Sequence, residues 1–301
     1  MRNIAVRKFL CVASALACVT ASYAQEQQEA LGFLRKQRDP AALSGGAAVG
    51  WSNPSLASFG EKKMETAFSY ASWAAAPSSD FSMAASYRLN PRFVIVADLS
   101  VDLGEEYDIY NKLGRVTDTF TPKDLIGGVG ASFLLKDNLS LGATVKYASS
   151  RLSPEASYGS VAADVFIAGH YGGLTATAGV SSLGPGVKSS DGTKYPLPTS
   201  GSFGFGYTGD FGEKLRTEVL LTSDVYFSGA TAEGFGASIC YDSLLTLRVG
   251  YNHGGNSVIP SYTTVGGGVH FSSFSIDGVY YMAASDSPLG NTFVLALRMS
   301  L

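Results

Sequence analysis

The sequence predicts an all-β protein, a transmembrane up-and-down antiparallel β-barrel of about 14 strands with an N-terminal plug segment in its lumen. Only 16% of the residues are charged, 17 Phe and 16 Tyr are present, and beyond residue 24 no apolar run approaches the roughly 20 residues of a transmembrane helix. Apolar and polar side chains alternate with period two from residue 63 onward, and the connections alternate between short and long. These observations indicate strands that face lipid on one side and water or protein on the other.

Residues 1–24 are predicted to be a secretory signal peptide. Three basic residues, Arg2, Arg7 and Lys8, precede an apolar stretch at 9–19, and small residues occupy the positions that a signal peptidase reads before residue 25. A short membrane anchor and a lipoprotein modified at Cys18 are the alternatives. Removal of this segment leaves Cys240 as the only Cys, which excludes an internal disulfide. The formal net charge of −3 argues against a nucleic-acid partner, because proteins that bind nucleic acids usually carry a basic surface.

The period-two alternation defines the strands of the predicted barrel, residues 63–301. At the C-terminus, for example, Phe293, Leu295 and Leu297 share one face, whereas Thr292 and Arg298 share the other. The predicted strands, about fourteen in number, span 63–74, 80–89, 92–103, 122–135, 139–150, 157–171, 174–182, 200–208, 215–226, 232–241, 244–252, 261–271, 274–281 and 292–301.

The connections between these strands fall into two sets, because short turns rich in Asn, Asp, Gly and Pro alternate strictly with longer loops. An up-and-down barrel predicts this parity, since consecutive turns lie on opposite rims and the short turns of outer-membrane barrels are periplasmic. An even number of strands then places both termini in the periplasm. The long loops at 104–121 and 183–199 are expected to be external. Their candidate partner-docking residues are Tyr107, Tyr110, Phe120, Tyr195 and Leu197.

Charged side chains on the second face of the strands are expected to lie in the lumen. A charge on the lipid side near the middle of the membrane costs roughly 2–4 kcal/mol, whereas luminal water or a counter-charge can satisfy it. The predicted luminal charges are Lys146, Arg216, Glu218, Arg248, Asp277 and Arg298.

Residues 25–62 differ from the barrel because the alternation is absent. A charged stretch at 25–38 is followed by a stretch at 39–59 in which Gly, Pro, Ala and Ser dominate. A barrel of about 14 strands has a lumen too wide for its own side chains to fill. We therefore expect this segment to fold into the lumen as a plug, and a disordered periplasmic leader is the alternative.

Several short motifs carry a resemblance to known proteins. They are Phe33-Leu34-Arg35, Ala41-Ala42-Leu43-Ser44-Gly45-Gly46, Trp51-Ser52-Asn53-Pro54-Ser55-Leu56 and Tyr195-Pro196-Leu197-Pro198-Thr199. The chain resembles the PorV/PorQ family, outer-membrane proteins linked to type IX secretion. That family is similar to the FadL-type long-chain fatty-acid transporters, fourteen-stranded barrels whose N-terminal hatch carries an Asn-Pro-Ala motif. The resemblance implies that Gly45, Gly46, Asn53 and Pro54 belong to such a hatch, with Ser55 in place of the usual Ala.

The resemblance implies a non-enzymatic role in type IX protein secretion, with the translocon or the C-terminal signal domains of cargo as partners. A FadL-like channel for a hydrophobic ligand is the alternative, and an outer-membrane hydrolase is a third hypothesis. The chain has three His and no HxH, HExxH or CxxC pattern. We therefore expect no metal site and no cofactor, and no catalytic residue is assigned.

Overall fold

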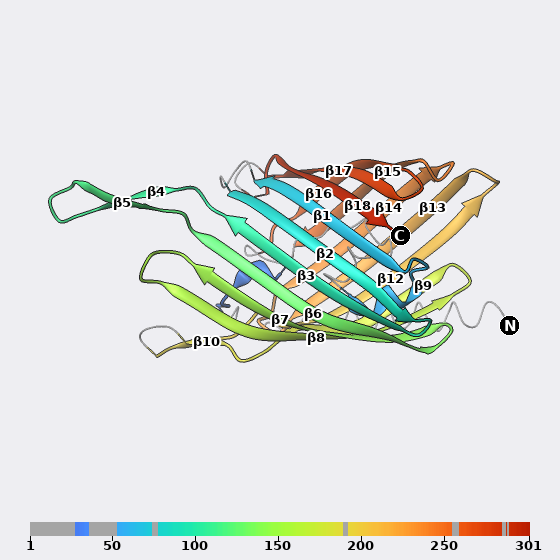
Figure 1. Ribbon diagram of the computed structural model, residues 1–301, viewed down its shortest axis with the longest axis horizontal. Helices are drawn as coiled ribbons and strands as arrows, with labels where there is room; N and C mark the ends of the chain where they lie inside the picture. Colours follow the sequence, from blue (N-terminus) through green and yellow to red (C-terminus); the bar gives the residue numbers. More distant parts are fainter. Residues whose placement is uncertain are drawn as a thin grey trace.

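Fourteen strands close into one antiparallel barrel in the computed structural model (Figure 1), which describes residues 28–35, 53–73, 78–188, 192–254, 259–284, 287 and 289–301. Each barrel strand is hydrogen-bonded to its neighbour along the chain, and β1 pairs with β18 to complete the circle. The barrel strands are β1 (Met64–Trp73), β2 (Ser78–Asn90), β3 (Phe93–Leu103), β6 (Lys123–Lys136), β7 (Leu139–Arg151), β8 (Ser157–Tyr171), β9 (Leu174–Leu183), β12 (Ser200–Phe211), β13 (Leu215–Tyr226), β14 (Thr231–Tyr241), β15 (Leu245–Gly254), β16 (Tyr262–His270), β17 (Phe274–Ala283) and β18 (Thr292–Ser300).

The predicted fold class is confirmed. Every predicted strand overlaps one barrel strand, and no strand end differs by more than three residues. The prediction succeeded because the two faces of each strand meet different surroundings. On β7, Leu141 and Val145 point outward and are exposed, whereas Ser140, Thr144 and Lys146 point inward and are buried.

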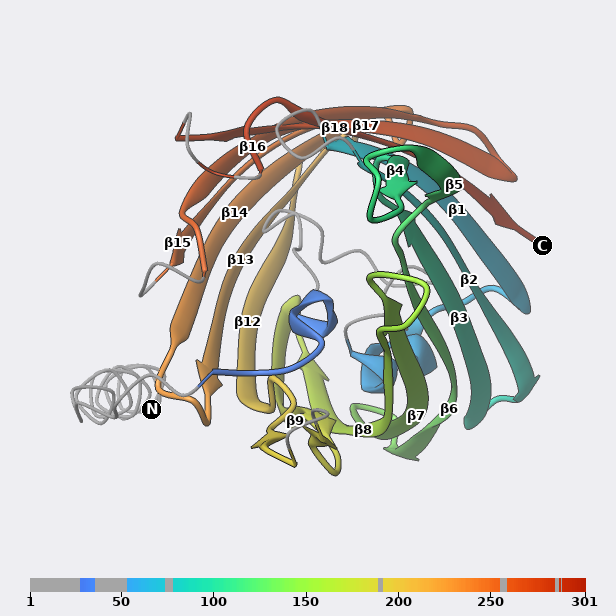
Figure 2. The ribbon, with the colours of Figure 1, turned by 90° about the vertical axis from the view of Figure 1, so that its left-hand side faces the viewer.

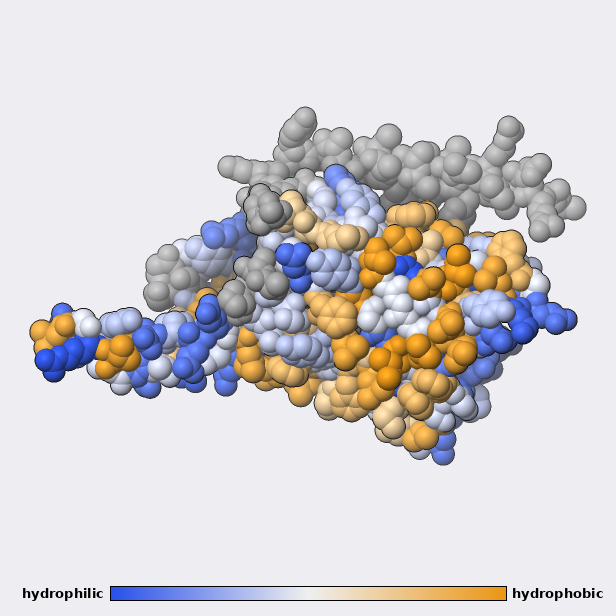
Figure 3. Space-filling view, turned by 90° about the horizontal axis from the view of Figure 1, so that it is seen from above, coloured by the Kyte–Doolittle hydropathy of each residue, from blue (hydrophilic) through white to orange (hydrophobic). Residues whose placement is uncertain are grey.

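The outer wall of the barrel exposes many large apolar side chains, among them Phe81, Leu141, Val161, Leu247 and Leu295. Figure 3 shows hydrophobic side chains gathered over the wall and hydrophilic ones toward the hairpin that projects at one end. Closure pairs the backbone groups of every strand with a neighbour on each side, which leaves no open sheet edge for lipid to meet. An apolar outer belt on a closed barrel is the arrangement of a transmembrane β-barrel. No helix formed by the described residues is long and apolar enough to cross a membrane.

The two longest connections contain strands of their own, which the sequence analysis treated as loops. In one, β4 (Tyr107–Tyr110) and β5 (Val116–Phe120) form a hairpin that projects beyond the barrel rim (Figure 1). Its turn is closed by Asn111, whose side-chain oxygen accepts hydrogen bonds from the backbone N–H groups of Leu113 and Arg115. In the other, β10 (Val187–Lys188) pairs with β11 (Lys194–Tyr195).

Two short 3-10 helices lie inside the barrel (Figure 2), η1 (Gly32–Leu34) and η2 (Pro54–Phe59). Both belong to the segment 25–62, and both pack against the inner face of the wall formed by β6, β7 and β8. The described parts of this segment therefore occupy a part of the lumen, and they are called the plug below. The signal peptide prediction, Gly45 and Gly46 lie outside the described residues.

Candidate functional site

The helix η2 is fixed to the wall by a buried hydrogen-bond network. The side-chain oxygen of Asn53 accepts from the backbone N–H of Ser55 (3.2 Å) and from its hydroxyl (2.5 Å), which caps the start of the helix. The hydroxyls of Ser132 and Ser140 donate to the Ser55 carbonyl at 3.1 and 2.7 Å. Asn53 thus orients the helix start, while the two wall serines hold it. Pro54 is the first residue of η2 and supplies the fixed φ that suits this position.

Gly142 on β7 makes the close approach of η2 to the wall sterically feasible. A Cβ atom at this position would lie 2.3 Å from the Ser55 nitrogen and 2.6 Å from the Pro54 carbonyl carbon. The conformation of Gly142 itself is ordinary for a strand, so the requirement is for space and not for backbone freedom.

Arg88 holds the other end of η2. Its guanidinium group donates to the carbonyl oxygens of Ala57 (3.4 Å), Ser58 (3.2 Å) and Gly60. These carbonyls lie at the C-terminal end of the helix, where a cation is favourable, and the Ala57 carbonyl also accepts from the Gly60 N–H (3.4 Å). Because Arg88 extends from the inner face of β2, it ties the plug to the wall two strands away from Ser132 on β6.

The helix η1 is held mainly by apolar packing. Leu31 and Leu34 are buried against wall and loop residues, namely Ile126, Ala148, Ala162, Val187 and Leu197. One backbone hydrogen bond joins this segment to the loop, from the N–H of Ala30 to the carbonyl of Pro196 (2.8 Å). Arg35 lies over the Tyr226 ring, 5.6 Å from its centroid, and forms an ion pair with Glu29.

The loop between β9 and β12 folds inward against η1. The hydroxyl of Ser160 donates to the Pro185 carbonyl (2.7 Å), and that of Thr199 donates to the Ser182 carbonyl (2.8 Å). Leu197 is consequently only 3% exposed. Its assignment to an exposed docking surface was wrong, because this apolar side chain covers the plug.

The other docking candidates lie on or beside the projecting β4–β5 hairpin and the β10–β11 pair. Tyr107 and Tyr110 are exposed, whereas Phe120 and Tyr195 are half-buried. The Tyr107 hydroxyl donates to the Leu152 carbonyl (3.0 Å), and the Tyr107 and Phe120 rings are in contact with centroids 5.7 Å apart. Tyr107 and Phe120 therefore anchor the base of the hairpin, and Tyr110 near the tip is the residue that faces solvent.

Lys146 lies on the inner face and is neutralised by a residue that the sequence analysis missed. Its ammonium group is 2.6 Å from Asp164 on β8, and the side chains are 4% and 2% exposed. Asp164 also accepts from the Thr144 hydroxyl (3.2 Å) and the Ser182 N–H (2.8 Å). Ser182 has φ of 55° at the place where the register of β8 and β9 shifts. Asp164 thus neutralises the charge of the buried Lys146, and its hydrogen bond to Ser182 stabilises β9 where the register shifts.

A second charged cluster lies on the inner face of β15, β17 and β18. The Arg248 and Arg298 guanidinium groups are 3.3 and 3.4 Å from the two carboxylate oxygens of Asp277. The strand between Arg248 and Asp277 is β16, and glycines on it leave room for both side chains. A Cβ at Gly268 would lie 2.3 Å from Asp277, and one at Gly266 would lie 2.9 Å from Arg248.

Arg216 and Glu218 lie on the inner face of β13 near the rim that carries the short turns. Glu218 is half-buried, and Arg216 is exposed. Among the residues whose placement the structure describes, no group of three or more His, Cys, Asp or Glu is arranged to hold a metal ion.

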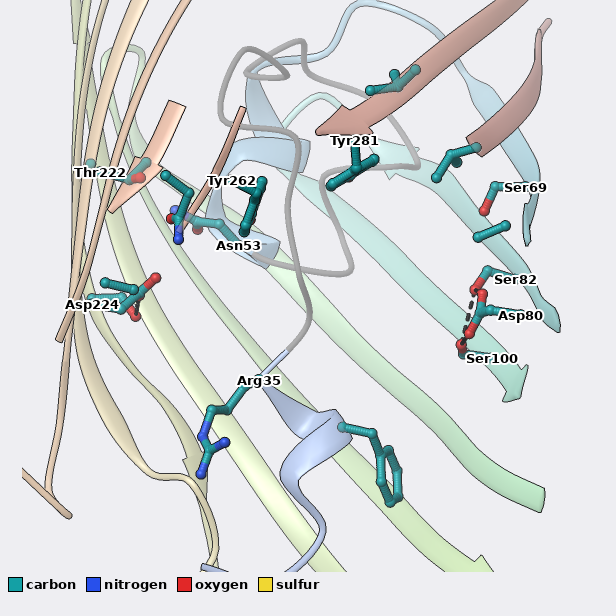
Figure 4. A pocket seen from close by; sticks show the side chains of 18 of the residues that line it. Arg35, Asn53, Ser69, Asp80, Ser82, Ser100, Thr222, Asp224, Tyr262 and Tyr281 are labelled. Carbon is teal, nitrogen blue, oxygen red and sulfur yellow. Dashed lines mark hydrogen bonds between the residues drawn. The ribbon is translucent and has the colours of Figure 1, made fainter. Parts of the chain in front are cut away.

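A cavity of about 550 Å³ lies between the plug and the barrel wall. Figure 4 shows Asp80, Ser82 and Ser100 on one side of this cavity, Thr222 and Asp224 on the other, and Asn53 of the plug between them. Tyr262 and Tyr281 extend into the same space. Arg35, Arg248 and Arg298 also line the cavity. It therefore joins the plug, the charged cluster and aromatic side chains in one luminal site.

No protein-family model and no curated protein matches the sequence. Solved structures share the fold. The toluene transporter TodX of Pseudomonas putida superposes with a TM-score of 0.59 at 14% identity, covering 86% of this chain and 95% of TodX. The toluene transporter TbuX of Ralstonia pickettii gives 0.57 at 13% identity, covering 93% of this chain and 100% of TbuX. A FadL homologue of Pseudomonas aeruginosa gives 0.53 at 10% identity, covering 93% of this chain and 100% of the homologue.

The comparisons confirm the likeness to FadL-type barrels at the level of the fold. They give no support to the narrower resemblance to PorV/PorQ, which continues to rest on the sequence motifs alone. TodX and TbuX are described as toluene transporters.

Proposed function

We propose that this protein is a bacterial outer-membrane channel that admits hydrophobic small molecules and does not act as an enzyme. The observation that carries the proposal is the luminal cavity of about 550 Å³, bounded by the plug on one side and the wall on the other. Ligand pockets typically enclose about 300–1,000 Å³ and combine apolar walls with a few polar groups. The cavity has this size and composition, and it lies inside a barrel whose fold the toluene transporters share.

The lengths of the loops indicate how the proposed channel is oriented in the outer membrane. All short turns lie on one rim. The first barrel strand begins and the last one ends at the same rim, where the N–H of Lys63 donates to the Leu301 carbonyl. Short turns are periplasmic in outer-membrane barrels. Both termini would then lie in the periplasm after export, outer-membrane lipid would surround the wall, and a solute would enter from the rim that carries the β4–β5 hairpin.

Uptake of labelled toluene by cells tests this function. The host should lack its own hydrocarbon channel and keep an intact outer membrane, so that toluene crosses slowly without the protein. Expression of the wild-type chain should raise the initial rate of uptake severalfold. Ala71→Phe, which places a ring in the cavity from the inner face of β1, should reduce that rate by about half or more.

The matched control for this experiment is Ala97→Phe, because Ala97 lies on the outer face of β3. It adds the same ring on the lipid side and should leave uptake unchanged. Equal uptake with and without the protein, or equal loss in both variants, would contradict the proposal.

A role in type IX secretion is the second candidate function, and the external hairpin favours it. Near the hairpin tip, Tyr110 is 61% exposed and Leu113 is 82% exposed, and such apolar side chains on an ordered projection suit a protein partner. Co-purification of cargo C-terminal signal domains with the intact protein, and its loss when residues 108–119 are replaced by a Gly-Ser linker, would support this role. Unchanged co-purification after that replacement would exclude the hairpin as the docking surface.

A further inference from the structure

The wall of the cavity formed by β2, β3 and β6 carries an arrangement of carboxylates that the fold alone does not require. Asp80 is directly opposite Asp102 in the strand pairing, and Asp102 is directly opposite Asp124. All three line the cavity. Like charges at directly opposite positions destabilise a sheet, and no described Lys or Arg forms an ion pair with any of the three.

Hydrogen bonds hold these carboxylates toward the cavity. Asp80 accepts from the hydroxyls of Ser82 (2.5 Å) and Ser100 (2.8 Å), one at each oxygen, as Figure 4 shows. One oxygen of Asp124 is buried and has no hydrogen-bond partner among the described residues. A buried polar atom without a partner is uncommon in proteins and calls for an explanation such as an absent ligand or water.

The basic groups at the cavity form their ion pairs with other acids. Arg35 forms an ion pair with Glu29, and Arg248 and Arg298 share Asp277. The remainder of the lining includes the aromatic side chains of Phe33, Trp73, Tyr262 and Tyr281. The indole N–H of Trp73 also has no partner among the described residues. The cavity thus combines an aromatic body with a negatively charged wall.

We propose that the cavity selects hydrophobic molecules that carry an amine or another hydrogen-bond-donating group, and that it discriminates against carboxylates. This selection rests on the proposed channel function and names the class of solute that the channel favours. An apolar part of the solute packs against the aromatic side chains, while its ammonium group lies at the wall formed by Asp80, Asp102 and Asp124. A carboxylate of the same shape would meet three acidic side chains and no cation from the described residues of that wall.

Binding of four probes with one shared ring tests the selection: toluene, benzyl alcohol, benzylamine and benzoate. The chain has two Trp, so the full-length protein carrying Trp51→Phe reports binding through the fluorescence of Trp73 at the cavity. The cavity variant adds Asp80→Asn, Asp102→Asn and Asp124→Asn. The control variant removes three acids of the external hairpin instead, through Glu105→Gln, Asp108→Asn and Asp118→Asn. Asp102→Asn alone serves if the triple variant fails to fold.

Benzylamine should bind about tenfold more tightly than benzoate, as expected for a partly screened charge interaction at the cavity wall. The two affinities should become about equal in the cavity variant and keep their wild-type ratio in the hairpin variant, which should also bind toluene as tightly as the wild type does. Asp102→Asn alone should lower the preference for benzylamine over benzoate, but by less than the triple substitution does. Toluene binding without a preference for the amine, or a preference that persists in the cavity variant, would overturn the selection and leave the channel function intact. Failure of every probe to bind would overturn both.

Discussion

The two helices of the plug are attached to the same wall in different ways. The attachment of η2 combines apolar packing of Leu56 and Ala57 with hydrogen bonds from two wall serines at its start and from Arg88 at its end. The attachment of η1 is apolar, through Leu31 and Leu34, with one backbone hydrogen bond to the loop.

The backbone conformations of the two helix starts reinforce this difference. Asn53 precedes η2 in an extended conformation (φ −154°) that suits a capping residue. Leu31 precedes η1 with φ of 52°, in the left-handed region that costs a non-glycine residue roughly 1–2 kcal/mol. η2 is therefore the fixed anchor of the plug, and η1 is the part that a small change in packing can release. Variants that weaken the attachment of one helix therefore show whether the other helix stays attached on its own.

The largest effect is expected for Leu31→Ala combined with Leu34→Ala. Each truncation of a buried Leu costs about 2–5 kcal/mol, and η1 has few polar contacts to compensate. Hydrogen exchange should accelerate strongly at residues 30–35 and stay slow at 53–60. Leu141→Ala, on the outer face of β7, is the control and should change neither segment. Equal acceleration in both segments would show that the plug opens as one unit.

Gly142→Ala should release η2 in the same assay. The added Cβ overlaps the backbone of Ser55, and overpacking of this kind costs about 1–3 kcal/mol. The matched control is Gly169→Ala on β8, where the nearest atom to an added Cβ is 3.9 Å away. If both variants retain slow exchange at 53–60, the close contact between η2 and β7 does not hold the plug.

Arg88→Met should have a smaller effect, about 1–2 kcal/mol, because the aliphatic part of the side chain is kept while the charged hydrogen bonds are lost. Exchange should accelerate at the C-terminal end of η2, at Ser58 and Gly60, more than at its start. Arg92→Met, in the neighbouring turn, removes a similar charge and should have no such effect. Loss of protection that begins at Ser55 instead would assign Arg88 a different role.

Arg35→Met combined with Glu29→Gln should have the smallest effect. This double variant removes the ion pair without leaving the buried Glu29 carboxylate unpaired, and the lost contact with the Tyr226 ring is worth about 0.5–1 kcal/mol. Exchange at 30–35 should rise by less than in the double Leu variant, and Arg35→Lys alone should keep most of the protection. Full release of η1 by the Arg35 and Glu29 double variant would mean that the cation, and not the apolar packing, holds this helix.

The sequence was sufficient for features that depend on one strand at a time. The alternation of Leu141 and Val145 with Ser140 and Thr144 reports two different surroundings within a single strand, and it located all barrel strands. Asn53-Pro54 was expected only as part of a hatch, and the helix that begins at Pro54 was not predicted, although a capping residue followed by Pro is a local signal for a helix start.

The sequence did not predict the features that depend on the register between strands. Asp80, Asp102 and Asp124 are far apart in the chain, and only the pairing of three strands aligns them. The partnership of Lys146 with Asp164 has the same origin. The burial of Leu197 was missed because Pro-rich loops are usually exposed, although its apolar neighbours in the loop were a signal that it folds inward.

Conductance in planar bilayers tests most directly whether the N-terminal segment closes the lumen. The single-channel conductance of the protein lacking residues 25–60 should be well above that of the intact protein, since the helices no longer occupy the space inside the wall. Replacement of hairpin residues 108–119 removes chain outside the lumen and should leave conductance unchanged. Equal conductance with and without residues 25–60 would contradict the assignment of this segment as a plug.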